Sequence, residues 1–177
     1  MTEISLKGLP ENLNKFLKLI TYTEGTDKLG IPYNTAFKYK TFFDLSKHPE
    51  IKTPFFNPAK NKMDYSTAAG RYQFIKPTWD RISKKLGLKD FSAVSQDKAA
   101  IEQLKETGSY NDILNGNWIQ AIEKNAQIWA SLPGSKHKQP TFTLKKALAF
   151  LGTTAGKIST VAVFFLIITI YFLTRKK

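Results

Sequence analysis

Apolar residues recur at helical spacing in four stretches of the chain. The first stripe begins at Leu13, passes through Ile20 and stops at Glu24, directly before Gly25. A glycine just past an apolar stripe is typical of a helix C-terminus, so we predict that the first helix ends at Glu24. The other three stripes predict helices within residues 75–88, 92–108 and 115–134.

Polar residues mark the expected ends of two of these helices. Ser95 is the predicted N-cap of the helix within 92–108, and Gly108 is its predicted stop. Asn117 is the predicted N-cap of the last helix. Trp129 lies on the apolar stripe of that helix, which favours a place in the core over one in the wall of a cleft.

A small β element accompanies the helices. Residues 35–45 mix aromatic and polar residues in rough alternation, which predicts a short hairpin or an extended loop. With 42% hydrophobic residues the chain can bury a core of ordinary size. We therefore predict the α+β fold class, with a mainly helical domain and a small β element.

A long apolar run lies near the C-terminus. Residues 158–174 carry no charge, and Lys157 and Arg175 flank them. These 17 residues would form a helix of about 25 Å, a little under a hydrocarbon core of about 30 Å. We predict a transmembrane helix here, and a buried core helix is the alternative that this length permits.

Charge divides the chain near the same place. The net charge is +13, and residues 135–177 hold 8 of the Lys and Arg residues and none of the 14 acids. Pro133 and Gly134 end the last helical pattern of the acid-containing part. The predicted organisation is a folded domain at 1–134, a basic linker at 135–157, the transmembrane helix at 158–174 and a basic tail at 175–177.

The composition excludes several kinds of site. The chain has no cysteine, which rules out disulfides, zinc–thiolate sites and thiol catalysis. Its two histidines, His48 and His137, are too few for a histidine-rich metal site, and we expect no metal and no cofactor. Acids are interspersed among the lysines of residues 1–134 and no nucleic-acid-binding motif stands out, so nucleic acid is not an expected partner.

Glu24 is the candidate for acid catalysis, because it stands at the abrupt end of an amphipathic helix. A carboxyl beside apolar neighbours loses the solvation of its charged form, so its pKa rises and it can donate a proton near neutral pH. The alternative is an ordinary solvated glutamate. Asp27, Asp44 and Asp64 are the other candidate carboxylates, and one of them opposite Glu24 would indicate a hydrolase.

A second stretch with functional chemistry is STAAGRYQFIKPTWD, residues 66–80. Its small residues let the backbone pass close to a ligand, and Tyr72 and Gln73 then supply an aromatic face and an amide with donor and acceptor. This pairing suits a sugar ring that carries an N-acetyl group. The alternative is an ordinary turn before the helix that starts at Pro77.

Five blocks in fixed order give the chain a family resemblance. They are TEGTD at 23–27, FFDLSKHP at 42–49, AAGRYQFIKPTWD at 68–80, LGLKDFSAVSQDKAA at 86–100 and IWASLPG at 128–134. Together they resemble the phage lambda endolysin family, which comprises lytic transglycosylases with a lysozyme-like fold that cut bacterial peptidoglycan. The resemblance covers roughly residues 12–134, and it implies a lysozyme-like fold for this domain.

The resemblance also implies roles for particular residues. Glu24, in the EGT block, corresponds to the sole essential carboxylate of the family, and Tyr72 and Gln73, in the GRYQ block, correspond to residues that line its glycan cleft. The chain departs from the family pattern in the loop that follows Glu24 and in the apolar run at 158–174.

The implied reaction is cleavage of the β-1,4 bond between N-acetylmuramic acid and N-acetylglucosamine. It consumes no water and leaves a 1,6-anhydromuramic end. One alternative is a hydrolytic muramidase of the same fold, with Asp27 or Asp44 as its second carboxylate. Another is a non-catalytic, membrane-anchored virion protein that binds the cell wall.

The apolar run determines the predicted location. A lytic domain joined to a single membrane helix suggests an enzyme of the virion membrane of a membrane-containing phage, used to penetrate the host. The host inner membrane is the alternative location, with lysis as the role. The expected partners are bacterial peptidoglycan, the lipid membrane through residues 158–174, and other virion proteins.

Overall fold

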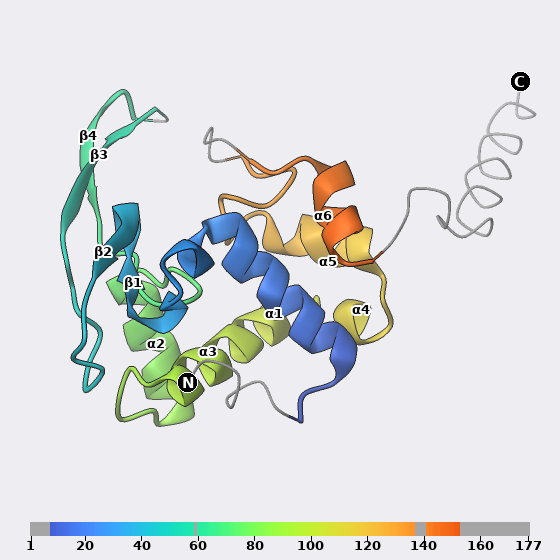
Figure 1. Cartoon of the computed structure of the whole chain (residues 1–177), viewed down its shortest axis with the longest axis horizontal. Helices are drawn as coiled ribbons and strands as arrows, with labels where there is room; N and C mark the ends of the chain where they lie inside the picture. Colours follow the sequence, from blue (N-terminus) through green and yellow to red (C-terminus); the bar gives the residue numbers. More distant parts are fainter. Residues whose placement is uncertain (1–7, 59, 137–140, 153–177) are drawn as a thin grey trace, which may run out of the picture.

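The protein is a mainly helical body with a two-stranded hairpin along one side (Figure 1). The computed structural model describes residues 8–58, 60–136 and 141–152. The α-helices are α1 (Glu11–Glu24), α2 (Lys76–Leu86), α3 (Ala93–Glu106), α4 (Tyr110–Leu114), α5 (Trp118–Asn125) and α6 (Leu144–Phe150). The short 3-10 helices are η1 (Thr26–Leu29), η2 (Pro32–Asn34) and η3 (Phe37–Tyr39), and the strands are β1 (Thr35–Ala36), β2 (Lys40–Thr41), β3 (Thr53–Asn57) and β4 (Lys62–Ser66).

Helix α1 runs through the middle of the body and supplies much of its core (Figure 1). Burial of a large apolar side chain stabilises the fold by about 1.5–3 kcal/mol. Five such residues of α1 are at most 1% exposed: Leu13, Phe16, Leu17, Leu19 and Ile20. The Asn12 amide donates a hydrogen bond of 3.0 Å to the Leu114 carbonyl of α4, which fixes the start of the helix.

The strands form two separate antiparallel pairs. β1 pairs with β2 inside the stretch where a β element was predicted. β3 pairs with β4, with Thr53 opposite Ser66 and Asn57 opposite Lys62. The sequence did not predict this longer hairpin, because Pro54 and Pro58 weaken its strand pattern.

The helix ends agree with the predictions in part. α1 ends at Glu24, as predicted. The prediction of Ser95 as the N-cap of α3 was wrong: Ser92 caps this helix, and its hydroxyl accepts the N–H of Ser95. The last predicted helix is shorter than its apolar stripe, since α5 ends at Asn125 and Trp129 is buried beyond it.

Residues 141–152 fall within the predicted basic linker, but they pack against the folded domain. Three apolar side chains of this segment belong to the buried core: Ala147, Leu148 and Leu151. Tyr22 of α1 contacts two of its rings, with centroids 5.0 Å from Phe142 and 4.8 Å from Phe150. The domain therefore extends past residue 134 to include helix α6.

Within the described part of the chain, the helices are all too short to cross a bilayer. The longest, α1 and α3, have 14 residues, or about 21 Å of helix against a hydrocarbon core of about 30 Å. The predicted transmembrane helix at 158–174 and the predicted tail at 175–177 lie outside the described residues.

The packing of α6 predicts a difference between two leucines of the same helix. Leu148 is 8% exposed and Leu144 is 39% exposed. We expect Leu148→Ala to lower the free energy of unfolding by about 2–3 kcal/mol through the cavity it leaves, and Leu144→Ala to lower it by less than about 1 kcal/mol. Urea denaturation followed by circular dichroism measures both. Equal, small effects would mean that residues 141–152 act as a linker after all.

Candidate active site

Glu24 is the last residue of α1, and the chain turns sharply after it. Gly25 adopts φ +67, a left-handed conformation that glycine reaches without strain, and its N–H closes the helix on the Tyr22 carbonyl. A Cβ on Gly25 would lie 3.2 Å from the Lys28 side chain and 3.3 Å from the Tyr39 hydroxyl. The glycine therefore both ends the helix and leaves room for the loop that folds back over it.

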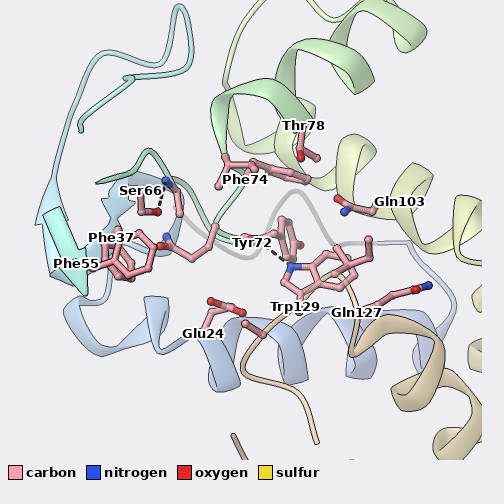
Figure 2. Close-up of a pocket in the computed structure, with 15 residues that line it drawn as sticks. Glu24, Phe37, Phe55, Ser66, Tyr72, Phe74, Thr78, Gln103, Gln127 and Trp129 are labelled. Carbon is pink, nitrogen blue, oxygen red and sulfur yellow. Dashed lines mark hydrogen bonds between the residues drawn. The ribbon is translucent and has the colours of Figure 1, made fainter. Parts of the chain in front are cut away.

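Two cavities meet at Glu24. The larger, of about 410 Å³, lies between the β3–β4 hairpin and the segment that follows α5, and Phe55 and Trp129 are among its lining residues. The smaller, of about 220 Å³, is lined by residues of η1, β1 and η3. Glu24 and Phe37 line both cavities. Figure 2 shows the Glu24 carboxylate in the larger cavity, between the Phe37–Phe55 ring pair and Trp129.

The environment of Glu24 favours its protonated form. Removal from water raises the pKa of this carboxyl, and the hydroxyl and backbone N–H of Ser131 offset part of that effect by hydrogen bonding to it. The position at the C-terminal end of α1, where backbone carbonyls point, also disfavours a negative charge. A group that holds its proton at higher pH than an ordinary glutamate suits general acid catalysis.

Ser131 fixes the orientation of the Glu24 carboxyl. Its Oγ donates to Glu24 Oε1 at 2.6 Å and lies 3.0 Å from Thr23 Oγ1. The Phe142 N–H in turn donates to the Ser131 carbonyl at 2.9 Å. No role for Ser131 was predicted from the sequence. Its place in the IWASLPG block was the available signal, but the contact with Glu24 spans 107 positions of the chain.

Tyr72 lies at the cavity with its hydroxyl turned into the protein (Figure 2). The hydroxyl donates to Asp97 Oδ1 at 2.5 Å, and the Tyr33 hydroxyl donates to the same carboxylate. Arg71 completes the buried group by donating to Tyr33 at 2.7 Å and to Thr21 at 2.8 Å. Burial, followed by the charge of Asp97, holds the pKa of Tyr72 well above its usual range, so this tyrosine stays a donor.

The Tyr72 ring is therefore part of the floor of the cavity. Only 1% of the residue is exposed, and its O–H is already donated to Asp97. Gly70, two residues before Tyr72, has a φ of +76, and a Cβ at this position would collide with the Gln96 amide. This turn can pack so closely against α3 only because residue 70 is glycine. The predicted contact of Tyr72 with a sugar stays a prediction.

Three glutamine side chains line the larger cavity: Gln73, Gln103 and Gln127. Gln73 donates through Nε2 to the Thr35 and Gly70 carbonyls, at 3.0 and 2.9 Å, which uses both amide hydrogens. Its oxygen remains as an acceptor, so only half of the predicted donor–acceptor pair is available. Gln103 is buried, and its Oε1 has no hydrogen-bond partner among the residues that the structure describes. The sequence analysis did not single out Gln103.

Among the described residues, no second carboxylate lines the cavities beside Glu24. Asp27 and Asp44 are exposed, and neither they nor Asp64 line the two cavities. The Ser46 hydroxyl and N–H hold the pKa of Asp44 below its usual value. Among the residues that the structure describes, Glu24 is the sole carboxylate lining either cavity.

Trp129 is both buried and part of the site. The residue is 3% exposed and belongs to the core cluster, as predicted, and it also lines the larger cavity. Its Nε1–H donates to the Tyr72 carbonyl at 3.0 Å (Figure 2). For residues 8–58, 60–136 and 141–152, the structure shows no group of three His, Cys, Asp or Glu side chains that would hold a metal ion.

Known proteins share both the sequence and this architecture. The family model described as Endolysin matches residues 14–158. The endolysin of Escherichia phage lambda is 41% identical over 129 residues, which cover 70% of this chain and 78% of the relative. The endolysin of Escherichia phage P2 is 34% identical over 158 residues, which cover 82% of this chain and 94% of the relative.

A solved structure of the lambda protein shares the fold. Bacteriophage lambda lysozyme complexed with a chitohexasaccharide has a TM-score of 0.73 and 36% sequence identity, covering 82% of this chain and 97% of that chain. A second lambda lysozyme structure has a TM-score of 0.68 and 35% identity, covering 81% of this chain and 92% of that one. The fold is therefore a lysozyme-like α+β fold, as predicted.

The matches identify the class of enzyme and then the family. A lysozyme-like fold with a glutamic acid in its cleft defines a glycosidase of the lysozyme type. The chain belongs to the endolysin family of phage enzymes, which degrade peptidoglycan. The family predicted from the five sequence blocks is thus confirmed.

The predicted location was wrong. We expected an enzyme anchored by one helix in a virion membrane or in the host inner membrane, with lipid and virion proteins as partners. The relatives are the endolysins of lambda and P2, and within the described residues there is no helix long and apolar enough to span a membrane. The expectation depended on the 17-residue run at 158–174, whose helix would be only about 25 Å long.

Removal of the Ser131 hydroxyl provides a test of its effect on Glu24. The hydroxyl stabilises the ionised carboxylate, so Ser131→Ala should raise the pKa of Glu24 further. We expect the alkaline limb of the pH–rate profile for peptidoglycan degradation to move to higher pH, and kcat/KM at the optimum to fall about tenfold. Ser83→Ala, whose hydroxyl bonds only the Asp80 carbonyl among the described residues, is the control. An unchanged profile for Ser131→Ala would contradict this role.

The buried carboxyl also predicts how stability depends on pH. Folding raises the pKa of Glu24, so its contribution to stability is complete below the ordinary glutamate pKa and is lost as pH rises through the raised pKa. Glu24→Gln should therefore increase Tm relative to the wild type at pH 8 but not at pH 4.

Glu11 provides a control variant for which the expected change in Tm at pH 8 has the opposite sign. Its bond of 2.7 Å to Lys15 lowers its pKa, so it contributes stability above the ordinary glutamate pKa, and this contribution is lost at lower pH. Glu11→Gln should leave Tm unchanged at pH 4 and decrease it slightly at pH 8. Differential scanning calorimetry at the two pH values measures both variants, and a decrease for Glu24→Gln at pH 8 would contradict the prediction.

Proposed function

We propose that this endolysin cleaves the β-1,4 bond between N-acetylmuramic acid and N-acetylglucosamine without water, leaving a 1,6-anhydromuramic end. The observation that supports this most directly is that Glu24 is the sole carboxylate lining the cleft among the described residues. Glycosidases that use water as the final acceptor ordinarily need two carboxylates, whereas an internal acceptor on the sugar makes the second one unnecessary.

Glu24 acts twice in this reaction. As an acid it gives its proton to the glycosidic oxygen, and the bond from that oxygen to the anomeric carbon of the muramic acid breaks. The acetamido oxygen of the same sugar stabilises the positive charge that develops at the anomeric carbon. The Glu24 carboxylate then takes the proton of the C6 hydroxyl, and O6 bonds to the anomeric carbon. The proton that Glu24 gave is returned, and the C6 hydroxyl takes the place of a water molecule.

Ser131 supports the second half of this cycle. Glu24 carries a negative charge between the two proton transfers, in a site that disfavours charge. The Ser131 Oγ–H stabilises that ionised form through its 2.6 Å bond. Burial thus favours the protonated form of Glu24, which acts as the acid, and Ser131 favours its ionised form, which acts as the base.

The remaining lining residues suit a polysaccharide. The rings of Phe37 and Phe55, with centroids 5.8 Å apart, supply apolar area against which sugar faces can pack. The amide oxygen of Gln73 is an acceptor for sugar hydroxyls or an acetamido N–H. Tyr72, anchored by its bond to Asp97, forms the part of the cavity floor next to Gln73. A chitohexasaccharide bound to the lambda lysozyme supports a glycan strand as the ligand of this cleft.

We assign the reaction to lysis of the host cell. The two relatives from phages lambda and P2 are both endolysins, and this supports the assignment. In that role the enzyme cuts the glycan strands of the peptidoglycan that encloses the host, and the weakened wall fails under turgor.

Mass spectrometry of released muropeptides tests the chemistry. The full chain is incubated with purified peptidoglycan, and Glu24→Gln, which cannot donate or accept the proton, is the inactive control. We expect fragments with anhydromuramic ends, one water lighter than hydrolytic products, from the wild type, and a rate at least about 10³-fold lower from the variant.

Two other outcomes would overturn the proposal. Reducing muramic ends would mean hydrolysis, in which case Asp27 and Asp44 become the candidates to activate water in spite of their exposed positions. No release by the wild type would mean that the chain binds the cell wall without cutting it.

A further inference from the structure

The loop that follows Glu24 builds the smaller of the two cavities. Here the sequence departs from the family pattern, and the loop forms the three short helices η1, η2 and η3. Lys38 and Tyr39 line the cavity together with Glu24 and Phe37.

Lys28 and Tyr39 form a pair at the edge of the smaller cavity. Lys28 Nζ donates to the Tyr39 hydroxyl at 2.7 Å and lies 5.1 Å from the centroid of its ring. Both side chains pack over Gly25, the residue next to Glu24. Because the Tyr39 oxygen accepts this bond and none other is recorded for it within the described residues, its own proton is available to a ligand.

Lys38 adds a second positive charge to the smaller cavity, which it lines together with Tyr39. Its Nζ donates to the Pro54 carbonyl of β3 at 2.7 Å, which leaves two ammonium hydrogens. Lys38 and Tyr39 are consecutive and both have positive φ, +57 and +59. Non-glycine residues in this region are strained, by about 1 kcal/mol or more each, and such strain is concentrated at functional sites.

Neither lysine forms a salt bridge with a described residue, and the pKa of Lys28 is raised by its bond to Tyr39 and, to a smaller extent, by the charge of Asp27. Within the described residues no carboxylate oxygen lies within 4.0 Å of Lys28 or Lys38, although nine other such contacts pair acids with bases elsewhere. Asp27 precedes Lys28 but is exposed. Glu24, the one acid that lines the cavity, has a raised pKa and a bond to Ser131 instead. Two lysines and a phenol thus lie at this end of the cleft, and among the described residues no carboxylate is in contact with either lysine.

We propose that Lys28, Lys38 and Tyr39 bind a carboxylate of the peptide stem that a muramic acid residue carries, and so favour peptide-substituted glycan over bare glycan. This proposal depends on the proposed function, because it takes peptidoglycan as the substrate. Muramic acid differs from the other sugar of the strand by a lactyl ether at O3, through which a short acidic peptide is attached. A charged pair of lysines with a phenolic donor beside them is suited to a carboxylate.

The test compares two substrates that differ in charge. One is native peptidoglycan, and the other is the same material after its carboxylates have been converted to primary amides with carbodiimide and ammonia. The quantity measured is the ratio of kcat/KM on the native to the amidated substrate. We expect the wild type to favour the native substrate about tenfold, and the Lys28→Gln, Lys38→Gln double variant to lose most of that preference. Tyr39→Phe should reduce the preference for the native substrate about threefold.

Lys40→Gln is the matched control for net charge. Lys40 is exposed, follows Tyr39 directly and lines neither cavity, so its removal changes the overall field with no change at the site. The ratio of kcat/KM on the native to the amidated substrate should be the same for Lys40→Gln as for the wild type. The preference of the wild type should also shrink as ionic strength rises, since salt screens charge pairs.

The outcomes separate this proposal from the one on which it depends. If the wild type cuts both substrates equally, or if the double variant keeps the wild-type ratio, the carboxylate site is wrong and the lytic activity stands. A fall in the ratio for Lys40→Gln as large as that for the double variant would assign the preference to net charge alone. If the wild type cuts neither substrate, the proposed function itself fails.

Discussion

The central constraint in this protein is that one carboxyl group has to keep its proton in a cleft that is open to a polymer. Glu24 satisfies this constraint because it lies at the end of a helix whose buried apolar residues are part of the core. Burial raises the pKa of the carboxyl, and Ser131 limits the rise by donating to one oxygen. The position of the helix, the turn at Gly25 and the chain around Ser131 all follow from that requirement.

The opposite wall of the cleft depends on a buried polar group, not on apolar packing alone. Arg71 and Asp97 would each be unfavourable inside a protein, but two tyrosine hydroxyls and a threonine hydroxyl satisfy them. Their arrangement holds residues 70–73 in a tight turn against α3. Within this turn, bonds from Gln73 to the Thr35 and Gly70 carbonyls fix its amide at the wall of the cavity.

Local patterns predicted the parts of the site that are formed by neighbours in sequence. The end of α1 at Glu24 was predictable, because an apolar stripe and a glycine lie within fifteen residues. The β3–β4 hairpin was not, because Pro54 and Pro58 weaken the strand signal while the pairing of Phe56 with Met63 is visible only in space. The same holds for Ser131 and for α6, whose contacts with α1 join positions more than 100 residues apart. Glu24, the candidate acid from the sequence, lies in the cleft, but only the fold identifies its hydrogen-bond partner Ser131.

The bond from Phe142 to Ser131 has a consequence for the order in which the enzyme becomes active. Tyr22 and Glu24 are made early, whereas Ser131 follows Glu24 by 107 positions and the rings that pack on Tyr22 belong to the last described segment of the chain. A nascent chain that already contains α1 and the turn at 70–73 still has a carboxyl without its hydrogen-bond donor. The hydrogen bond that orients the Glu24 carboxyl is thus completed late in synthesis, and a fragment clipped before Phe142 would lack the N–H that bonds the Ser131 carbonyl.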